Sequence, residues 1–202
     1  MNPHVQLNNA YAPLVRRIEQ EATVIGDQIL KIDHFLNHRI EPAFIADMGR
    51  ELARRLSAFQ PTLILTAEAS GIAPGLVVAQ ALNVPLVFAK KYSPEVESPS
   101  LSRIIPSPTK GGATKLVIAQ KFIPSGSRVV IVDDFLSNGR TAVALIEMAR
   151  EAGAEVLGAG FIVEKRFKLG HAAIDALDVP VATLAQVERL ENGKAVILQP
   201  QD

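Results

Sequence analysis

From residue 62 to residue 163, short apolar runs alternate with segments of helical periodicity. This alternation strongly constrains the fold, because it is typical of a parallel sheet whose strands are buried by helices on both faces. The predicted elements are strands at 62–67, 85–88, 114–119, 129–132 and 156–163, and helices at 72–82 and 141–152. We therefore expect an α/β fold with an open, mainly parallel, twisted sheet flanked by helices.

The two ends of the chain add further elements. These are predicted as helices at 13–22 and from Pro42, strands at 28–32, 181–184 and 195–198, and a turn at 191–194. The chain has 202 residues, which is long enough for one large domain. We expect a single domain over 13–202, with a small hood formed by about 13–40 and 165–202, and a disordered extension over 1–12.

The composition argues against several classes of protein. Lys plus Arg equal Asp plus Glu at 21 each, so there is no excess of positive charge for a nucleic-acid partner. Cysteine is absent, which excludes disulfides and thiolate metal sites. No stretch approaches the roughly 18 apolar residues of a membrane-spanning helix. We expect a cytoplasmic protein that binds neither nucleic acid nor membrane.

One long segment shows no periodicity. Between Lys90 and Gly112 the chain has four prolines, several serines and the pair Gly111-Gly112. A loop of this length inside a compact domain is usually a lid, a binding loop or a disordered segment. All three alternatives are open for residues 92–112 at this point.

The most informative stretch is residues 129–141, which read VVIVDDFLSNGRT. The predicted strand is followed by Asp133 and Asp134, at the end of a sheet strand where open α/β folds place their ligands. Adjacent carboxylates repel each other unless they meet solvent, hydroxyl donors or a cation. The small polar turn after them leads into a helix and can direct backbone N–H groups at a phosphate. The stretch predicts a sugar-phosphate site, although acids and a glycine turn also occur as ordinary strand endings.

This order of apolar strand, Asp-Asp pair and Gly/Thr loop resembles the 13-residue phosphoribosyl-diphosphate motif of the type I phosphoribosyltransferases. The resemblance implies that the catalytic-site carboxylates of Asp133 and Asp134 hold the ribose 2′- and 3′-hydroxyls. It also implies a 5′-phosphate loop made of Ser137, Asn138, Gly139, Arg140 and Thr141. Arg140 stands where many relatives have Gly or an uncharged side chain, so it either adds a phosphate contact or points to water.

Two further pieces match the same family. The turn after the strand at 62–67 resembles the pyrophosphate loop and consists of Glu68, Ala69, Ser70 and Gly71. Basic residues in the position of Lys90 and Lys91 reach the pyrophosphate in that family. The long loop after them folds over the active site in the family, so the resemblance implies that residues 92–112 form a lid. The alternatives are that the small residues serve only packing and that the lysines are solvated.

The chain ends resemble the xanthine phosphoribosyltransferase branch of the purine-salvage enzymes. The matching segments are 28–39 (QILKIDHFLNHR) and 162–165 (IVEK), and the resemblance covers about 13–198. It implies that the base is contacted by Leu30, Asn37 and Lys165. A fixed lysine favours xanthine, which loses a proton near neutral pH and carries two carbonyls. Alternatively, Leu30 is a core residue, Asn37 a turn residue and Lys165 a surface charge.

The resemblance implies transfer of the 5-phosphoribosyl group from phosphoribosyl diphosphate (PRPP) to N9 of xanthine, which releases pyrophosphate. Magnesium is expected to be carried by PRPP rather than by protein side chains, and the protein is expected to be a homodimer. No general base is identified, because Ser137 stands where hypoxanthine-guanine relatives have Asp.

Other functions stay open at this point. The base could be guanine, hypoxanthine or adenine, and some proteins of this fold sense PRPP and regulate transcription without catalysis. Such regulators normally need a basic helical module, which the first 60 residues do not show. His34 and His38 stand four apart, as on a metal-binding helix face, but no third ligand is spaced nearby. We therefore expect no zinc site.

Overall fold

The computed structural model describes residues 7–91, 99–106 and 112–198. Its centre is an eight-stranded sheet in the order β10-β9-β8-β7-β3-β4-β6-β5. The strands are β3 (Leu63–Ala67), β4 (Leu86–Lys91), β5 (Ser100–Pro106), β6 (Ala113–Ala119), β7 (Arg128–Leu136), β8 (Glu155–Lys165), β9 (Val181–Glu191) and β10 (Lys194–Ile197). The five central strands run parallel, and the added strands at both edges are antiparallel. The expected open, mainly parallel sheet is confirmed.

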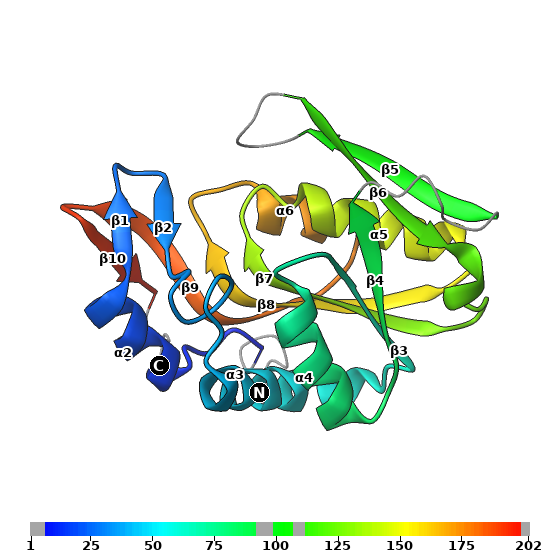
Figure 1. The fold of residues 1–202 in the computed structure, drawn as a ribbon, viewed down its shortest axis with the longest axis horizontal. Coiled ribbons are helices and arrows are strands. Elements are labelled where there is room, and N and C mark those ends of the chain that lie inside the picture. Colours follow the sequence, from blue (N-terminus) through cyan, green and yellow to red (C-terminus); the bar gives the residue numbers. More distant parts are fainter. Residues whose placement is uncertain (1–6, 92–98, 107–111, 199–202) are drawn as a thin grey trace.

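Helices cover both faces of this sheet (Figure 1). The helices are α2 (Ala12–Glu21), α3 (Pro42–Leu56), α4 (Ile72–Leu82), α5 (Arg140–Glu151) and α6 (Gly170–Asp175). Along β7, Val130 and Val132 pack into the core with α3 and α4, whereas Val129 and Ile131 pack into the core with α5. This alternation places a separate apolar layer on each face, because successive strand residues point to opposite sides.

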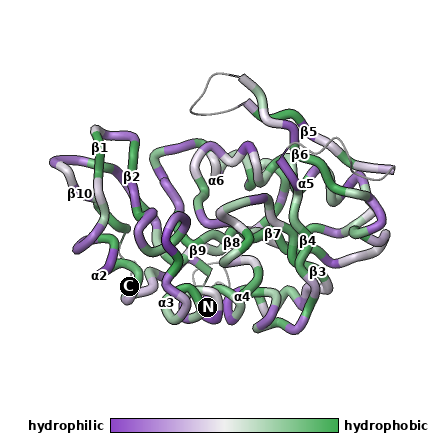
Figure 2. The backbone as a smooth tube through the Cα atoms, viewed as in Figure 1, coloured by the Kyte–Doolittle hydropathy of each residue, from purple (hydrophilic) through white to green (hydrophobic). Residues whose placement is uncertain are grey.

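Hydropathy follows this layered arrangement. Figure 2 shows hydrophobic residues along the helices and strands that meet at the centre, and hydrophilic residues in the peripheral turns. Every residue of β3 is buried, as expected for a strand covered on both sides. The continuous apolar runs of the sequence therefore lie in the middle of the sheet.

Helix α2 and the strands β1 (Thr23–Ile25) and β2 (Ile29–Lys31), from the first part of the chain, lie beside the last two strands at the β10 end of the sheet (Figure 1). There, α2 and the hairpin of β1 and β2 meet β9 and β10. The predicted hood includes these elements, and its status as a unit stays a prediction. Residues 1–6 of the expected extension lie outside the described residues, and Leu7 and Tyr11 make hydrogen bonds to the rest of the chain. The Tyr11 amide donates to the Leu184 carbonyl at 2.7 Å, and Arg55 binds the Leu7 carbonyl at 3.2 Å.

The segment expected to be a loop contains a strand. β5 pairs with β6 from Ser100 opposite Ala119 to Pro106 opposite Ala113. Its burial alternates only partly because it lies at the sheet edge, and its proline stands at the last position, where no ladder hydrogen bond is lost. Arg103 joins β5 to α5 through ion pairs with Glu147 (2.9 Å) and Glu151 (2.7 Å). The rest of the expected lid, 92–98 and 107–111, lies outside the described residues.

Candidate active site

The acid pair lies inside β7 rather than after it. On one side, β7 pairs with β8 as far as Leu136 opposite Glu164, whereas its pairing with β3 stops at Ile131. The prediction of a strand ending at residue 132 was wrong because β8 continues to offer backbone partners. Asp133 and Asp134 therefore lie past the last residues of β7 that pair with β3, toward the carboxyl ends of the parallel strands.

Each carboxylate accepts a backbone hydrogen bond, and that of Asp134 also accepts one from a side chain. The Asp134 amide donates to Asp133 Oδ1 and the Phe135 amide to Asp134 Oδ1, both at 2.9 Å. Asn37 Nδ2 donates to Asp134 Oδ2 at 2.8 Å. Burial, followed by the charge of Asp134, raises the pKa of Asp133 well above its ordinary value. The pair therefore disfavours its doubly charged form and would gain from a ligand that supplies hydroxyl donors or positive charge.

The turn between β3 and α4 approaches the acid pair closely. A Cβ on Gly71 would lie 2.5 Å from Asp133 Oδ1 and closer still to Thr66 Oγ1, so no side chain fits at residue 71. Glu68 accepts a hydrogen bond from the Lys91 amide at the end of β4. The predicted pyrophosphate turn is thus next to Asp133, with Ala69 exposed and Ser70 partly exposed.

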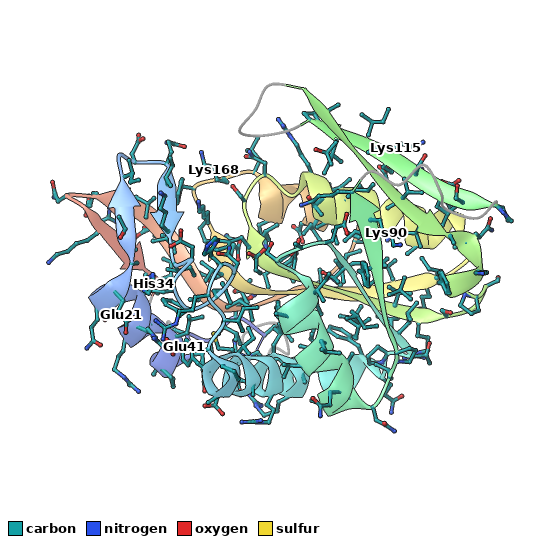
Figure 3. All side chains as sticks on the ribbon, viewed as in Figure 1. Glu21, His34, Glu41, Lys90, Lys115 and Lys168 are labelled. Carbon is teal, nitrogen blue, oxygen red and sulfur yellow. The ribbon has the colours of Figure 1, made fainter. Side chains whose placement is uncertain are left out.

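The lysines of β4 lie at the same carboxyl ends of the parallel strands, at the end of β4. Lys90 and Lys91 are both exposed. Figure 3 labels Lys90 on β4 and Lys168 after β8, on either side of β7, which lies between these strands in the sheet order. The structure thus brings the lysines to the edge that carries the turn at 68–71, with their side chains in solvent.

All five residues of the predicted phosphate loop line one pocket together with Asp133. The pocket is lined by Ile105, Pro106, Asp133, Phe135, Leu136, Ser137, Asn138, Gly139, Arg140, Thr141, Ala142 and Phe161. Gly139 has a φ of 74°, and a Cβ there would lie 2.9 Å from Gly170 Cα, so glycine is required on both grounds. α5 begins at Arg140 without an acidic residue in its first turn, so the positive helix end faces this loop uncompensated.

The three predicted base-binding residues have different surroundings. Leu30 is 6% exposed and packs in the core. Asn37 reaches the acid pair, as described above. Lys165 Nζ donates to the Gln28 carbonyl at 3.3 Å and lies 5.6 Å from the centroid of the Phe135 ring. Burial, followed by the charge of Lys168, lowers the pKa of Lys165.

Sequence reasoning missed several residues of this site. Phe135 lines the pocket and lies under Lys165, and its only signal is that it directly follows the acid pair. Ile105 and Pro106 line the pocket from β5, within the segment expected to be a lid. The Thr66 hydroxyl is buried beside Gly71, and it has no hydrogen-bond partner among the described residues. No sequence pattern distinguishes this threonine from an ordinary strand residue.

Within the described residues, no group of three or more His, Cys, Asp or Glu side chains is arranged to hold a metal ion.

Among the helices of the described residues, none has the length and apolar character needed to cross a membrane.

The loop at 137–141, the acid pair and the glycine turn at 68–71 lie together at the carboxyl ends of the parallel strands, which is where α/β enzymes that act on nucleotides bind their ligands. The chain belongs to the phosphoribosyltransferase family, since the model of the phosphoribosyl transferase domain matches residues 37–188. The xanthine phosphoribosyltransferase of Chloroflexus aurantiacus is 54% identical over 187 residues, which cover 93% of this chain and 89% of the relative. That of Heliobacterium modesticaldum is 46% identical, with 89% and 96% covered.

Solved structures show the same architecture. The adenine phosphoribosyltransferase of Rhodothermus marinus has a TM-score of 0.68 at 26% identity, and the alignment covers 87% of this chain and 99% of that one. The Trypanosoma brucei enzyme, solved with AMP, pyrophosphate and ribose-5-phosphate, has a TM-score of 0.72 at 19% identity, with 86% and 79% covered. The second likeness concerns the fold alone.

Proposed function

We propose that this enzyme transfers the 5-phosphoribosyl group from PRPP to N9 of xanthine and forms xanthosine 5′-phosphate and pyrophosphate. The observation that carries the proposal is that Asp133 and the whole loop 137–141 line one pocket at the carboxyl ends of the parallel strands. A pocket with hydroxyl acceptors on one side and backbone donors at a helix start on the other suits a ribose 5-phosphate group.

In this proposal the acid pair fixes the ribose while the loop fixes its phosphate. Asp133 and Asp134 accept the 2′- and 3′-hydroxyls, and their negative charge stabilises the cation-like ribose carbon during transfer. The turn at 68–71 and the exposed Lys90 and Lys91 receive the pyrophosphate. Magnesium would reach the site with PRPP, and it would neutralise the leaving group. Holding both substrates in line is the remaining contribution of the protein.

The choice of xanthine rests on Lys165 and on the curated relatives. An ammonium group donates hydrogen bonds and favours a base that presents carbonyls and negative charge. Adenine has no carbonyl and carries an amino donor at position 6, so it offers a lysine fewer acceptors and no negative charge. Adenine is nevertheless the second candidate, because the Rhodothermus marinus protein of similar fold, 26% identical to this chain, is an adenine phosphoribosyltransferase.

Purified protein should be assayed with PRPP, magnesium and a panel of xanthine, guanine, hypoxanthine, adenine and uracil. We expect turnover with magnesium only and the highest kcat/KM for xanthine. Preference for another base would correct the substrate, and binding of PRPP without any turnover would favour a regulatory protein. A homodimer in the cytoplasm belongs to the same proposal, and sedimentation of the purified protein would test the dimer.

A further inference from the structure

An ionic cluster around a buried glutamate adjoins the segment that contacts the phosphate loop. Glu164, near the end of β8, is fully buried. Its Oε1 lies 2.8 Å from His171 Nδ1 and accepts a hydrogen bond from Arg166 Nη1 at 3.1 Å. Its Oε2 accepts one from Gln186 Nε2 on β9 at 2.8 Å. Both carboxylate oxygens are thus bound, as a buried charge requires.

The contacts of Glu164 lower the pKa of its carboxyl group more than burial raises it. Burial alone raises the pKa of Glu164, but the hydrogen bond and charge of His171, followed by Gln186 and Arg166, lower it below its ordinary value. The carboxylate is therefore ionised in the fold and holds its partners by charge-assisted bonds. His171, which is partly exposed, becomes fixed relative to the end of β8.

The residue before His171 contacts the phosphate loop directly. The Gly170 amide donates to the Ser137 carbonyl at 2.8 Å. A Cβ on Gly170 would overlap the Ser137 carbonyl and lie 3.0 Å from the Gly139 nitrogen. The loop backbone therefore packs directly on Gly170, and Gly170 is the chain neighbour of the imidazole that Glu164 binds. In addition, Glu164 is the register partner of Leu136, the residue that precedes the loop.

We propose that Glu164 and His171 are positioning residues that hold the 5′-phosphate loop in its binding shape. This inference rests on the proposed function, because it assumes that the loop at 137–141 receives the ribose phosphate. The backbone donors of a phosphate loop bind well only when their directions converge on the anion. The Glu164–His171 pair sets those directions through Gly170, which contacts the loop backbone, and does not touch the substrate. It leaves the turn at 68–71, which receives pyrophosphate, unaffected.

The test uses two amide variants of similar size. In His171→Asn the side-chain amide takes the place of Nδ1 and can still reach Glu164, whereas in His171→Gln it is displaced toward the place of Nε2. Isothermal titration should measure the binding of ribose 5-phosphate and, separately, of magnesium pyrophosphate. We expect His171→Gln to weaken ribose 5-phosphate binding by about tenfold, with pyrophosphate binding unchanged and His171→Asn close to wild type.

Kinetics provide a second readout. His171→Gln should raise the KM for PRPP by a similar factor and change kcat much less, because the loop binds the donor in both ground and transition states. The matched control is His34→Ala, which removes the exposed pair between His34 and Glu21 (3.3 Å) in the predicted hood. It should leave both ligands bound as in wild type. Glu164→Gln, which keeps the shape but removes the charge, should behave as His171→Gln does.

The outcomes are distinct. Equal weakening of both ligands, or unchanged ribose 5-phosphate binding in His171→Gln and Glu164→Gln, would show that the cluster is only structural and would overturn the inference. The same holds if His171→Asn loses as much affinity as His171→Gln. If wild-type protein does not bind ribose 5-phosphate, or if Gly139→Ala binds it normally, the proposed function is wrong and the inference fails with it.

Discussion

The side-chain amide of Asn37 donates a 2.8 Å hydrogen bond to Asp134 Oδ2, across 97 positions of the chain. Asn37 comes from the segment that resembles a base site, and Asp134 from the proposed ribose site. The bond therefore joins the segment of the proposed base site to the acid pair. Asp134 is 6% exposed, so few other donors can reach that oxygen.

Asn37→Ala should weaken the binding of both substrates. Loss of a hydrogen bond to a buried charged group typically costs about 1.5 to 3 kcal/mol, or roughly ten- to hundredfold in kcat/KM. We expect KM to rise for PRPP as well as for xanthine, since Asp134 loses a partner. Steady-state kinetics with each substrate varied in turn will measure both effects. If only the KM for xanthine changes, Asn37 contacts the base and the coupling is absent.

Asp133→Asn should stabilise the free protein while it abolishes transfer. The pKa of Asp133 is raised in the fold, so the folded state favours the protonated acid. As the pH rises through the unfolded pKa of about 3.9, unfolding releases a proton that the folded state keeps, and the free energy of unfolding falls. Asparagine has nearly the same shape as aspartate but does not titrate, so the variant avoids this loss of stability. Its gain in the free energy of unfolding should be present at pH 7 and disappear below about pH 4.

Thermal unfolding without ligands at pH 7 and at low pH will check this gain. The control is Asp27→Asn, which changes an exposed aspartate in the turn between β1 and β2. It should not alter the Tm in a pH-dependent way. A lower Tm for Asp133→Asn at pH 7 would contradict the raised pKa.

Gly71→Ala should damage the site through a steric clash. The new Cβ would lie 2.5 Å from Asp133 Oδ1 and would overlap the Thr66 hydroxyl, so either the turn or the acid must move. Overpacking of this kind typically costs about 1 to 3 kcal/mol. We expect a lower Tm and a loss of magnesium-dependent pyrophosphate binding. Normal pyrophosphate affinity in a folded variant would show that the turn is not part of the donor site.

The sequence predicted the centre of the fold better than its margins. Apolar runs such as Val129–Val132 are buried on both faces, so their composition alone identifies them as strands. Strand β5 has no such signal, because an edge strand with one solvated face and a terminal proline looks like a loop. The acid pair was expected after β7 because polar residues usually end a strand, whereas pairing with β8 continues to Leu136.

The same distinction applies to the site. The loop 137–141 is contiguous, so its residue types suffice to predict that it lines a pocket with Asp133. The bond between Asn37 and Asp134 and the contact of Gly170 with Ser137 join distant segments and depend on how the strands are ordered in space. A single sequence contains no local pattern for such pairs. The roles of these residues toward substrates stay predictions.

Lys165→Ala gives the sharpest test of the base. The lysine lies 5.6 Å from the Phe135 ring, and burial with the charge of Lys168 lowers its pKa, so the ammonium is poorly solvated and gains from an anionic ligand. Removing it should cut kcat/KM for xanthine roughly ten- to hundredfold and reduce the preference over hypoxanthine, while the KM for PRPP changes little. Lys165→Arg, which keeps the charge, should retain part of the preference. A variant that loses PRPP affinity, or that keeps its full preference for xanthine, would show that Lys165 does not read the base.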